Sequence, residues 1–220
     1  MSFEPLDNLN GQTAVIAGAM GGIGYATAQR LADRGARIIG LVRRNIETAQ
    51  QRLDQLPNSH LKHRVILTDV TDRDQLSLAR NQIDRCDILV NASGSSVHIP
   101  HFRIDLLSDK IFDNTLTDNL RSQFSVIRTF LPLIKQSPSG LIVNLGSTAG
   151  TGTGGSNIAY AAAKGGLRNV SQQLGCEWAD RGVRVNSVSP GFIMTEMGRK
   201  DSSLHRTFAH AVVSQELWRG

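Results

Sequence analysis

Cysteine and aromatic residues are scarce in this chain of 220 residues. It has 2 cysteines, and aromatic side chains make up 5% of the sequence. Cys86 and Cys176 stand far apart, and neither lies in a CxxC pair or a Cys/His cluster, so we expect no metal site. We expect both cysteines to be buried thiols inside regular elements.

Long apolar runs are also absent, and so are the marks of a targeting segment. No apolar run follows a basic stretch near the N-terminus, which argues against a secretory signal. No stretch approaches the roughly 18 apolar residues that identify a membrane-spanning helix. We therefore expect a cytoplasmic protein with no membrane partner.

Positive charge is in excess, but it is not concentrated. The formal net charge is +5 and the pI is near 9.7, with lysines and arginines scattered along the chain. A nucleic-acid-binding protein usually gathers such charge on one face. We therefore expect a mildly basic surface and no nucleic-acid partner; attraction for an anionic ligand such as a phosphorylated cofactor stays open.

Short apolar segments alternate with helical patterns along the whole chain. This alternation predicts an α/β fold with one doubly wound, Rossmann-type parallel sheet of about six strands and helices on both faces. No linker or shift in composition divides the chain, so we expect a single domain over 1–220, with a cofactor half at about 1–110 and a catalytic and substrate half at about 111–220. The predicted strands are 13–17, 37–42, 65–67, 87–90, 141–145 and 183–188, and the later predicted helices are 46–56, 72–83, 108–133 and 157–179.

A glycine-rich turn, GAMGGIG, joins the first predicted strand to the first predicted helix. Glycine lets backbone N–H groups approach a pyrophosphate at a helix N-terminus, where the helix dipole favours negative charge. The spacing of Gly18, Gly22 and Gly24 differs from GxGxxG. The turn predicts a dinucleotide site, with an ordinary tight turn as the alternative.

Two arginines, Arg43 and Arg44, directly follow the second predicted strand. In a dinucleotide fold an acidic residue at this point holds a ribose 2′-hydroxyl, whereas an arginine accommodates a 2′-phosphate. No carboxylate occupies the end of this strand, so the sequence favours NADP(H) over NAD(H). The alternative is that both arginines are solvated loop charges.

Tyr160 and Lys164 are four residues apart in a helical pattern, so they share one helix face. A nearby ammonium is expected to lower the pKa of the tyrosine hydroxyl from its ordinary value of about 10, which makes a proton donor and acceptor usable near neutral pH. Ser147, at the end of the fifth predicted strand, offers a hydrogen bond to the same substrate oxygen. The Tyr/Lys spacing alone is a weak signal.

Taken together, these residues resemble the classical short-chain dehydrogenase/reductase family. The resemblance covers roughly 11–197 and places six of the family's motifs in the right order. The family's TGxxxGxG is matched at 17–24 with Ala17 in place of threonine, its adenine-contacting aspartate at Asp69, its NNAG at 91–94, its catalytic asparagine at Asn119, its serine, tyrosine and lysine at Ser147, Tyr160 and Lys164, and its PG motif with a following threonine at Pro190, Gly191 and Thr195.

The resemblance implies reversible hydride transfer between NADP(H) and a ketone or aldehyde and its alcohol. Tyr160 would protonate the substrate oxygen, Ser147 would hold and polarise it, and Lys164 would bind the nicotinamide ribose. Asn119 would position a water that connects Lys164 to solvent. The implied cofactor-binding residues are Gly18, Met20, Gly22, Ile23, Gly24, Arg43, Arg44, Asp69, Val70, Asn91, Ala92, Gly94, Tyr160, Lys164, Pro190, Gly191, Ile193 and Thr195.

Family members usually continue past the PG motif through a substrate-covering helix to a seventh strand. Here 202–213 is a candidate for that helix, and no seventh strand follows, so either the chain is shortened or a tail is omitted. The family's four-helix contact uses the helices matched at 108–133 and 157–179. We therefore expect a homo-oligomer, a dimer or a tetramer.

The substrate stays open between a 3-oxoacyl thioester and a sugar-like or polyol-like carbonyl. The carrier-binding arginines of the 3-oxoacyl reductases would match Ser125 and Cys176, whereas Glu177 and the two residues after it resemble polyol dehydrogenases. His98, His101 and Phe102 are expected either to line the pocket or to be exposed in a loop. A non-catalytic NADP(H)-binding regulator on the same fold is the competing hypothesis.

Overall fold

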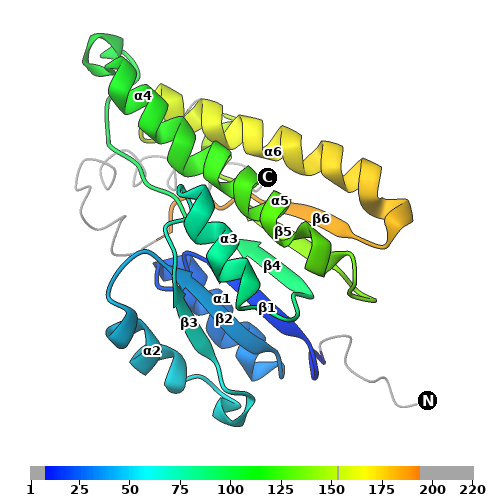
Figure 1. Cartoon of the computed structure of the whole chain (residues 1–220). Coiled ribbons are helices and arrows are strands. Elements are labelled where there is room, and N and C mark those ends of the chain that lie inside the picture. Colours follow the sequence, from blue (N-terminus) through cyan, green and yellow to red (C-terminus); the bar gives the residue numbers. More distant parts are fainter. Residues whose placement is uncertain (1–7, 153, 194–220) are drawn as a thin grey trace, which may run out of the picture.

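A parallel β-sheet forms the centre of the molecule in the computed structural model, which describes residues 8–152 and 154–193 (Figure 1). Its described strands follow the order β3-β2-β1-β4-β5-β6, and all neighbours pair in parallel. The order reverses between β1 and β4, where such sheets bind ligands beyond the carboxyl ends of the strands. The doubly wound α/β fold is confirmed, with strands β1 (Thr13–Ala17), β2 (Arg37–Val42), β3 (Arg64–Leu67), β4 (Ile88–Asn91), β5 (Leu141–Leu145) and β6 (Arg184–Val188).

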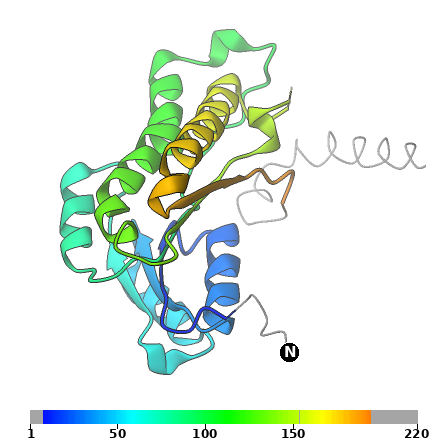
Figure 2. The same cartoon turned by 90° about the vertical axis from the view of Figure 1, so that its right-hand side faces the viewer.

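Helices cover both faces of the sheet because successive strand side chains point to opposite sides. In β1, Ala14 and Ile16 pack with α1 and α2, while Val15 and Ala17 pack with α3 and α5. The two views show α1 and α3 on opposite sides of the sheet (Figures 1 and 2). The α-helices are α1 (Gly22–Asp33), α2 (Ile46–Asp54), α3 (Arg73–Asn81), α4 (Asp109–Leu116), α5 (Ser122–Ile134) and α6 (Ile158–Trp178).

The helix expected over 108–133 is present, and it is helical without a break from Asp109 to Ile134. A π-helical turn, Thr117–Arg121, separates α4 from α5. Side chains take over backbone acceptors there: Asn119 Nδ2 donates to the Thr115 carbonyl at 3.0 Å, and Ser122 Oγ donates to the Asp118 carbonyl at 2.9 Å. Single π-turns of this kind occur frequently at functional sites.

The two cysteines differ in burial, so the expectation for one of them was wrong. Cys86 is buried between strand and helix, and burial raises the pKa of its thiol. Cys176 is exposed, because it lies on the face of α6 that points away from the sheet. No helix among the described residues is long and apolar enough to cross a membrane.

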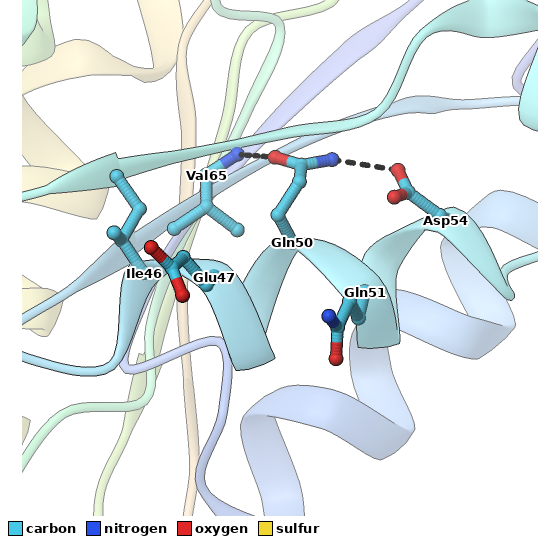
Figure 3. A pocket seen from close by; sticks show the side chains of 6 residues that line it. All are labelled: Ile46, Glu47, Gln50, Gln51, Asp54 and Val65. Carbon is cyan, nitrogen blue, oxygen red and sulfur yellow. Dashed lines mark hydrogen bonds between the residues drawn. The ribbon is translucent and has the colours of Figure 1, made fainter.

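One side chain, Gln50, hydrogen-bonds to two backbone groups at the free edge of β3. Gln50 Oε1 accepts from the Val65 N–H at 2.8 Å, while Gln50 Nε2 donates to the His63 carbonyl at 3.0 Å and to Asp54 Oδ1 at 2.7 Å. Figure 3 shows Gln50 reaching from α2 to Val65 beside a hollow of about 340 Å³. The amide thus occupies backbone groups that a neighbouring strand would otherwise use.

Candidate active site

A cavity of about 770 Å³ lies at the carboxyl ends of the central strands. Residues that are far apart in the sequence meet there, because parallel strands all end at the same edge of the sheet. The cavity brings together most of the predicted site: Gly18, Met20, Gly22, Ile23, Arg43, Arg44, Asp69, Val70, Ala92, Gly94, Asn119, Tyr160 and Lys164.

The glycine-rich turn lies against the segment that follows β4. Gly18 has a φ of +79°, and a Cβ at this position would lie 2.7 Å from the Ser93 nitrogen and 2.8 Å from its Cα. A Cβ on Gly24 would lie 2.2 Å from the Gly18 carbonyl oxygen. Glycine is therefore required at Gly18 by backbone conformation and close approach, and at Gly24 by close approach alone.

The start of α1 is suited to a phosphate group. The first turn of this helix carries no acidic residue, and Gly21 provides no side-chain cap. The first N–H groups of a helix lack intrahelical partners, and the dipole makes them attractive to an anion. Gly22 and Ile23 line the cavity at this point. The local structure thus fits the pyrophosphate of a dinucleotide.

Three arginines surround the end of the cavity beyond β2. Arg43 and Arg44 were predicted, whereas Arg52 of α2 was not. The Arg52 guanidinium lies 4.0 Å from the centroid of the Tyr25 ring, and the Tyr25 hydroxyl donates to the Arg52 carbonyl at 3.1 Å. No local sequence pattern marks Arg52, because it reaches the cavity only through the placement of α2. This positive end fits an added phosphate on the adenosine ribose.

Tyr160 and Lys164 project from the first two turns of α6. Lys164 is only 4% exposed, and its Nζ donates to the Leu145 carbonyl at the end of β5 at 2.7 Å. The Nζ atom lies 5.7 Å from the centroid of the Tyr160 ring. Burial lowers the pKa of Lys164 to about 8, because a charged ammonium loses solvation there.

The predicted direction of the Tyr160 pKa was wrong for this structure. Burial raises the pKa of the Tyr160 hydroxyl, and a hydrogen bond with the Ser147 side chain opposes that rise. The Lys164 ammonium, whose Nζ lies 5.7 Å from the centroid of the Tyr160 ring, does not offset this loss of solvation. Tyr160 is therefore a protonated hydroxyl at neutral pH.

Asn119 lies in the π-turn with one of its amide atoms unused. Its Nδ2 donates to the Ser95 carbonyl at 2.7 Å, while its buried Oδ1 has no partner among the described residues. A Cβ on Gly94 would lie 2.6 Å from that Oδ1 and 3.8 Å from Lys164 Nζ. Asn119 and Lys164 thus converge on Gly94, and the free oxygen suits a water or a ligand hydroxyl.

Several predicted residues do not line this cavity. Asn91 is buried below it and donates to Asn144 Oδ1 at 2.8 Å. Ser147 lies beside the cavity through its hydrogen bond to Tyr160, and the Pro190 carbonyl accepts from the Thr148 N–H at 3.0 Å. Thr195 and 202–213 lie outside the described residues; Gly24, Gly191, Ile193, His98, His101 and the 83%-exposed Phe102 do not contribute to the lining.

Ser95 and Asp118 line the cavity without having been predicted. The Ser95 hydroxyl donates to the Asp118 carboxylate. No local pattern in the sequence marks this pair, because it forms only when the segment after β4 meets the π-turn.

Comparison with known proteins agrees with this geometry. The family model described as short chain dehydrogenase matches residues 12–205. D-threitol dehydrogenase from Mycolicibacterium smegmatis is 37% identical over 196 residues, which is 87% of this chain and 74% of that protein. The 3-oxoacyl-acyl-carrier-protein reductase FabG from Escherichia coli is 35% identical over 199 residues, 87% of this chain and 78% of that protein.

A solved structure supplies a comparison in three dimensions. The Pseudomonas aeruginosa RhlG/NADP active-site complex superposes with a TM-score of 0.77 at 27% identity. The match covers 91% of this chain and 79% of that one.

We predict that Gly18→Ala weakens nucleotide binding by about tenfold or more, because the new methyl group would collide with the Ser93 backbone in an unfavourable conformation. The matched control is Gly21→Ala, whose Cβ would meet the Gly18 oxygen at 3.4 Å and whose φ is −68°. Fluorescence titration with NADPH measures both. Equal affinities for the two variants would contradict the assigned role of Gly18.

The burial of Lys164 is expected to lower the free energy of unfolding by an amount that depends on pH. Its pKa is lowered on folding, so the unfolded chain binds its proton more tightly. The resulting cost is absent above the unfolded pKa of about 10.4. It grows as the pH falls to about 8 and is fully present below that value.

We therefore compare the free energy of unfolding of Lys164→Met with that of wild type. As the pH falls from about 10.5 to 7, we expect this difference to shift in favour of Lys164→Met by on the order of 2–3 kcal/mol. Urea unfolding at the two pH values measures this change. If the difference in free energy of unfolding between the two proteins is the same at both pH values, folding does not lower the pKa of Lys164.

Proposed function

Because this chain belongs to the short-chain dehydrogenase family of oxidoreductases, we propose that it interconverts a carbonyl compound and its alcohol with NADP(H) as the hydride carrier. The observation that carries the proposal is the convergence of Tyr160, Lys164 and Asn119 on the cavity that also holds the glycine-rich turn. When bound, NADPH supplies the hydride, and the protein supplies position and protons.

Tyr160 is the proposed proton donor in the direction of carbonyl reduction. Its raised pKa keeps the hydroxyl protonated at neutral pH, so a proton is available when charge develops on the substrate oxygen. The Ser147 side chain is hydrogen-bonded to Tyr160, and we propose that both hydroxyls bind the same substrate oxygen. The reverse reaction uses the same pair, with Tyr160 as proton acceptor.

Lys164 and Asn119 are proposed to return the proton. With a pKa of about 8, Lys164 changes charge close to neutral pH. The ammonium form of Lys164 stabilises the phenolate that remains on Tyr160 after proton transfer. The unpaired Oδ1 of Asn119 accepts a hydrogen bond from the water or ligand hydroxyl through which the proton is returned.

The preference for NADP(H) is proposed from the three arginines at the adenosine end. Arg43, Arg44 and Arg52 line that end, and the carboxylate of Asp69 is engaged by the Thr71 N–H at 2.9 Å and the Thr71 hydroxyl at 2.7 Å. The related RhlG structure is an NADP complex. Asp69 is thus engaged by Thr71, and the positive charge of these arginines at the adenosine end favours a cofactor with a 2′-phosphate.

The substrate is proposed to be a small ketone or hydroxy compound. Relatives of this chain are named for a polyol, D-threitol, and for a 3-oxoacyl thioester. The positions matched to the carrier-binding arginines are Ser125 and Cys176, and neither carries a positive charge. The absence of these two cations weakens the case for a carrier-protein substrate and favours the polyol-like class.

We also propose self-association through the outer faces of α5 and α6. Phe124 on α5 is 42% exposed, and Cys176 on α6 is exposed. An exposed phenylalanine on a long helix is suited to burial against a second copy of the chain. Size-exclusion chromatography with light scattering tests this proposal.

Replacing Tyr160 by phenylalanine should remove the proton donor without changing the shape of the site. We expect kcat/KM for ketone reduction to fall by about 10²- to 10⁴-fold. NADPH oxidation against a panel of diketones, sugar ketones and 3-oxoacyl esters measures the loss, while NADPH affinity is expected to stay near that of wild type. Wild-type activity no greater than that of Tyr160→Phe would defeat the enzyme proposal in favour of an NADP(H)-binding regulator.

Arg43→Ala should separate the two nicotinamide cofactors. We expect the dissociation constant for NADPH to rise by about tenfold and that for NADH by less than about twofold, because only NADPH carries the 2′-phosphate. Arg30→Ala is the matched control, since Arg30 is exposed on α1 and pairs with Asp33. Equal losses for NADPH and NADH would show that Arg43 does not contact the phosphate.

A further inference from the structure

Asn157, the residue before α6, is fully buried and uses both ends of its side-chain amide. Its Oδ1 accepts from the Tyr160 N–H at 2.8 Å, and its Nδ2 donates to the Val97 carbonyl at 2.7 Å. The amide orientation is fixed by these partners, because the reverse orientation would place a donor against a donor. Asn157 therefore connects the backbone of the proposed proton donor to a segment 60 residues away in sequence.

Capping alone does not account for this residue. Serine, aspartate and asparagine cap helices about equally well, and other helices of this chain are capped by Ser108 and Asp72. Those two side chains only accept hydrogen bonds from their own helices. The donor end of Asn157, aimed at Val97, is the additional feature, and neither a serine nor an ionised aspartate reproduces it.

The segment 95–99 that Asn157 holds forms part of the site wall, because Ser95 lines the cavity. It has no regular secondary structure, so side chains fix its position. At one end, Asn119 Nδ2 donates to the Ser95 carbonyl at 2.7 Å. At the other, the Ile99 N–H donates to the Ser156 carbonyl at 2.7 Å, and the hydroxyls of Ser96 and Ser156 are hydrogen-bonded.

These contacts place Asn119 and Tyr160 at the two ends of one hydrogen-bonded path. The Asn119 side chain donates to the carbonyl of Ser95 at the start of 95–99. The Asn157 side chain donates to the Val97 carbonyl in the middle of that segment and accepts from the Tyr160 N–H. α6 also packs directly against the π-turn and α4, so loss of the Val97 bond would remove one of several contacts that set the exact position of the first turn of α6. Displacements of about 1 Å can cost about 100-fold in rate when reacting groups must be aligned.

We propose that Asn157 is a positioning residue that keeps Tyr160 aligned with Asn119 and with the 95–99 segment. The proposal rests on the function proposed above, in which Tyr160 transfers the proton. Asn157 itself touches neither substrate nor cofactor, and it acts through the Tyr160 backbone and the Val97 carbonyl.

The test is Asn157→Ser, which keeps a capping oxygen for α6 but loses the bond to the Val97 carbonyl. We expect kcat/KM for ketone reduction to fall by about tenfold or more, with NADPH affinity within about threefold of wild type. Asn157→Asp fills the same volume but turns an acceptor toward the Val97 carbonyl, so we expect an equal or larger kinetic loss. It replaces the serine variant if that protein is too unstable to purify.

The control for general destabilisation is Ser137→Ala. Ser137 Oγ donates to Asp87 Oδ1 at 2.6 Å near the amino end of β4, at the opposite end of the strand from the cavity. This variant should lower the melting temperature by about 2–4 °C and leave kcat/KM unchanged. If Asn157→Ser loses no more activity than Ser137→Ala, the positioning role is wrong.

Hydrogen exchange tests the same path without turnover. The Ile99 amide, bonded to Ser156 beside Asn157, should exchange about tenfold faster in Asn157→Ser than in wild type. Unchanged exchange would overturn the connection between Asn157 and 95–99. A wild type no more active than Tyr160→Phe would instead overturn the proposed function, and the exchange result would still decide the connection.

Discussion

The close contact between Gly18 and the Ser93 backbone is the constraint on which the rest of the site depends. Ala17 at the end of β1 pairs with Leu41 of β2 and with Asn91 of β4, so the turns that follow these strands begin at one level. Gly18 allows two of these turns to touch, because a Cβ there would lie within 3 Å of Ser93. The glycine-rich turn and the segment after β4 are thereby fixed relative to each other.

Buried polar side chains extend this constraint to α6, which carries Tyr160 and Lys164. Gln123 Nε2 holds the Ser93 carbonyl at 2.7 Å, and the Asn91 amide donates to Asn144, whose own amide donates to Ser171 of α6 at 2.9 Å. A buried polar network that is mostly satisfied favours one arrangement of its elements over others. The position of α6, and with it that of Lys164, follows from hydrogen bonds that start in the sheet.

Local sequence patterns sufficed for the strands, for the glycine turn and for the Tyr160/Lys164 face, because each depends on residues close in sequence. They did not suffice for features that arise from tertiary contacts. The π-turn has the same periodicity as a helix at this length, Arg52 joins the cavity only through the placement of α2, and the second bond of Asn157 spans 60 residues. The Tyr160 pKa was misjudged for the same reason, since its burial is not visible in the spacing to Lys164.

Gln50 can hydrogen-bond to the β3 edge of the sheet early in folding. Its partner Val65 is only 15 residues away, so the bond requires α2 and β3 but none of the later chain. Exposed strand edges are templates for intermolecular pairing while a protein is being synthesised. Two backbone groups at the β3 edge can therefore be occupied before α6 has been made, so this part of the edge is not left open to strand pairing with another chain.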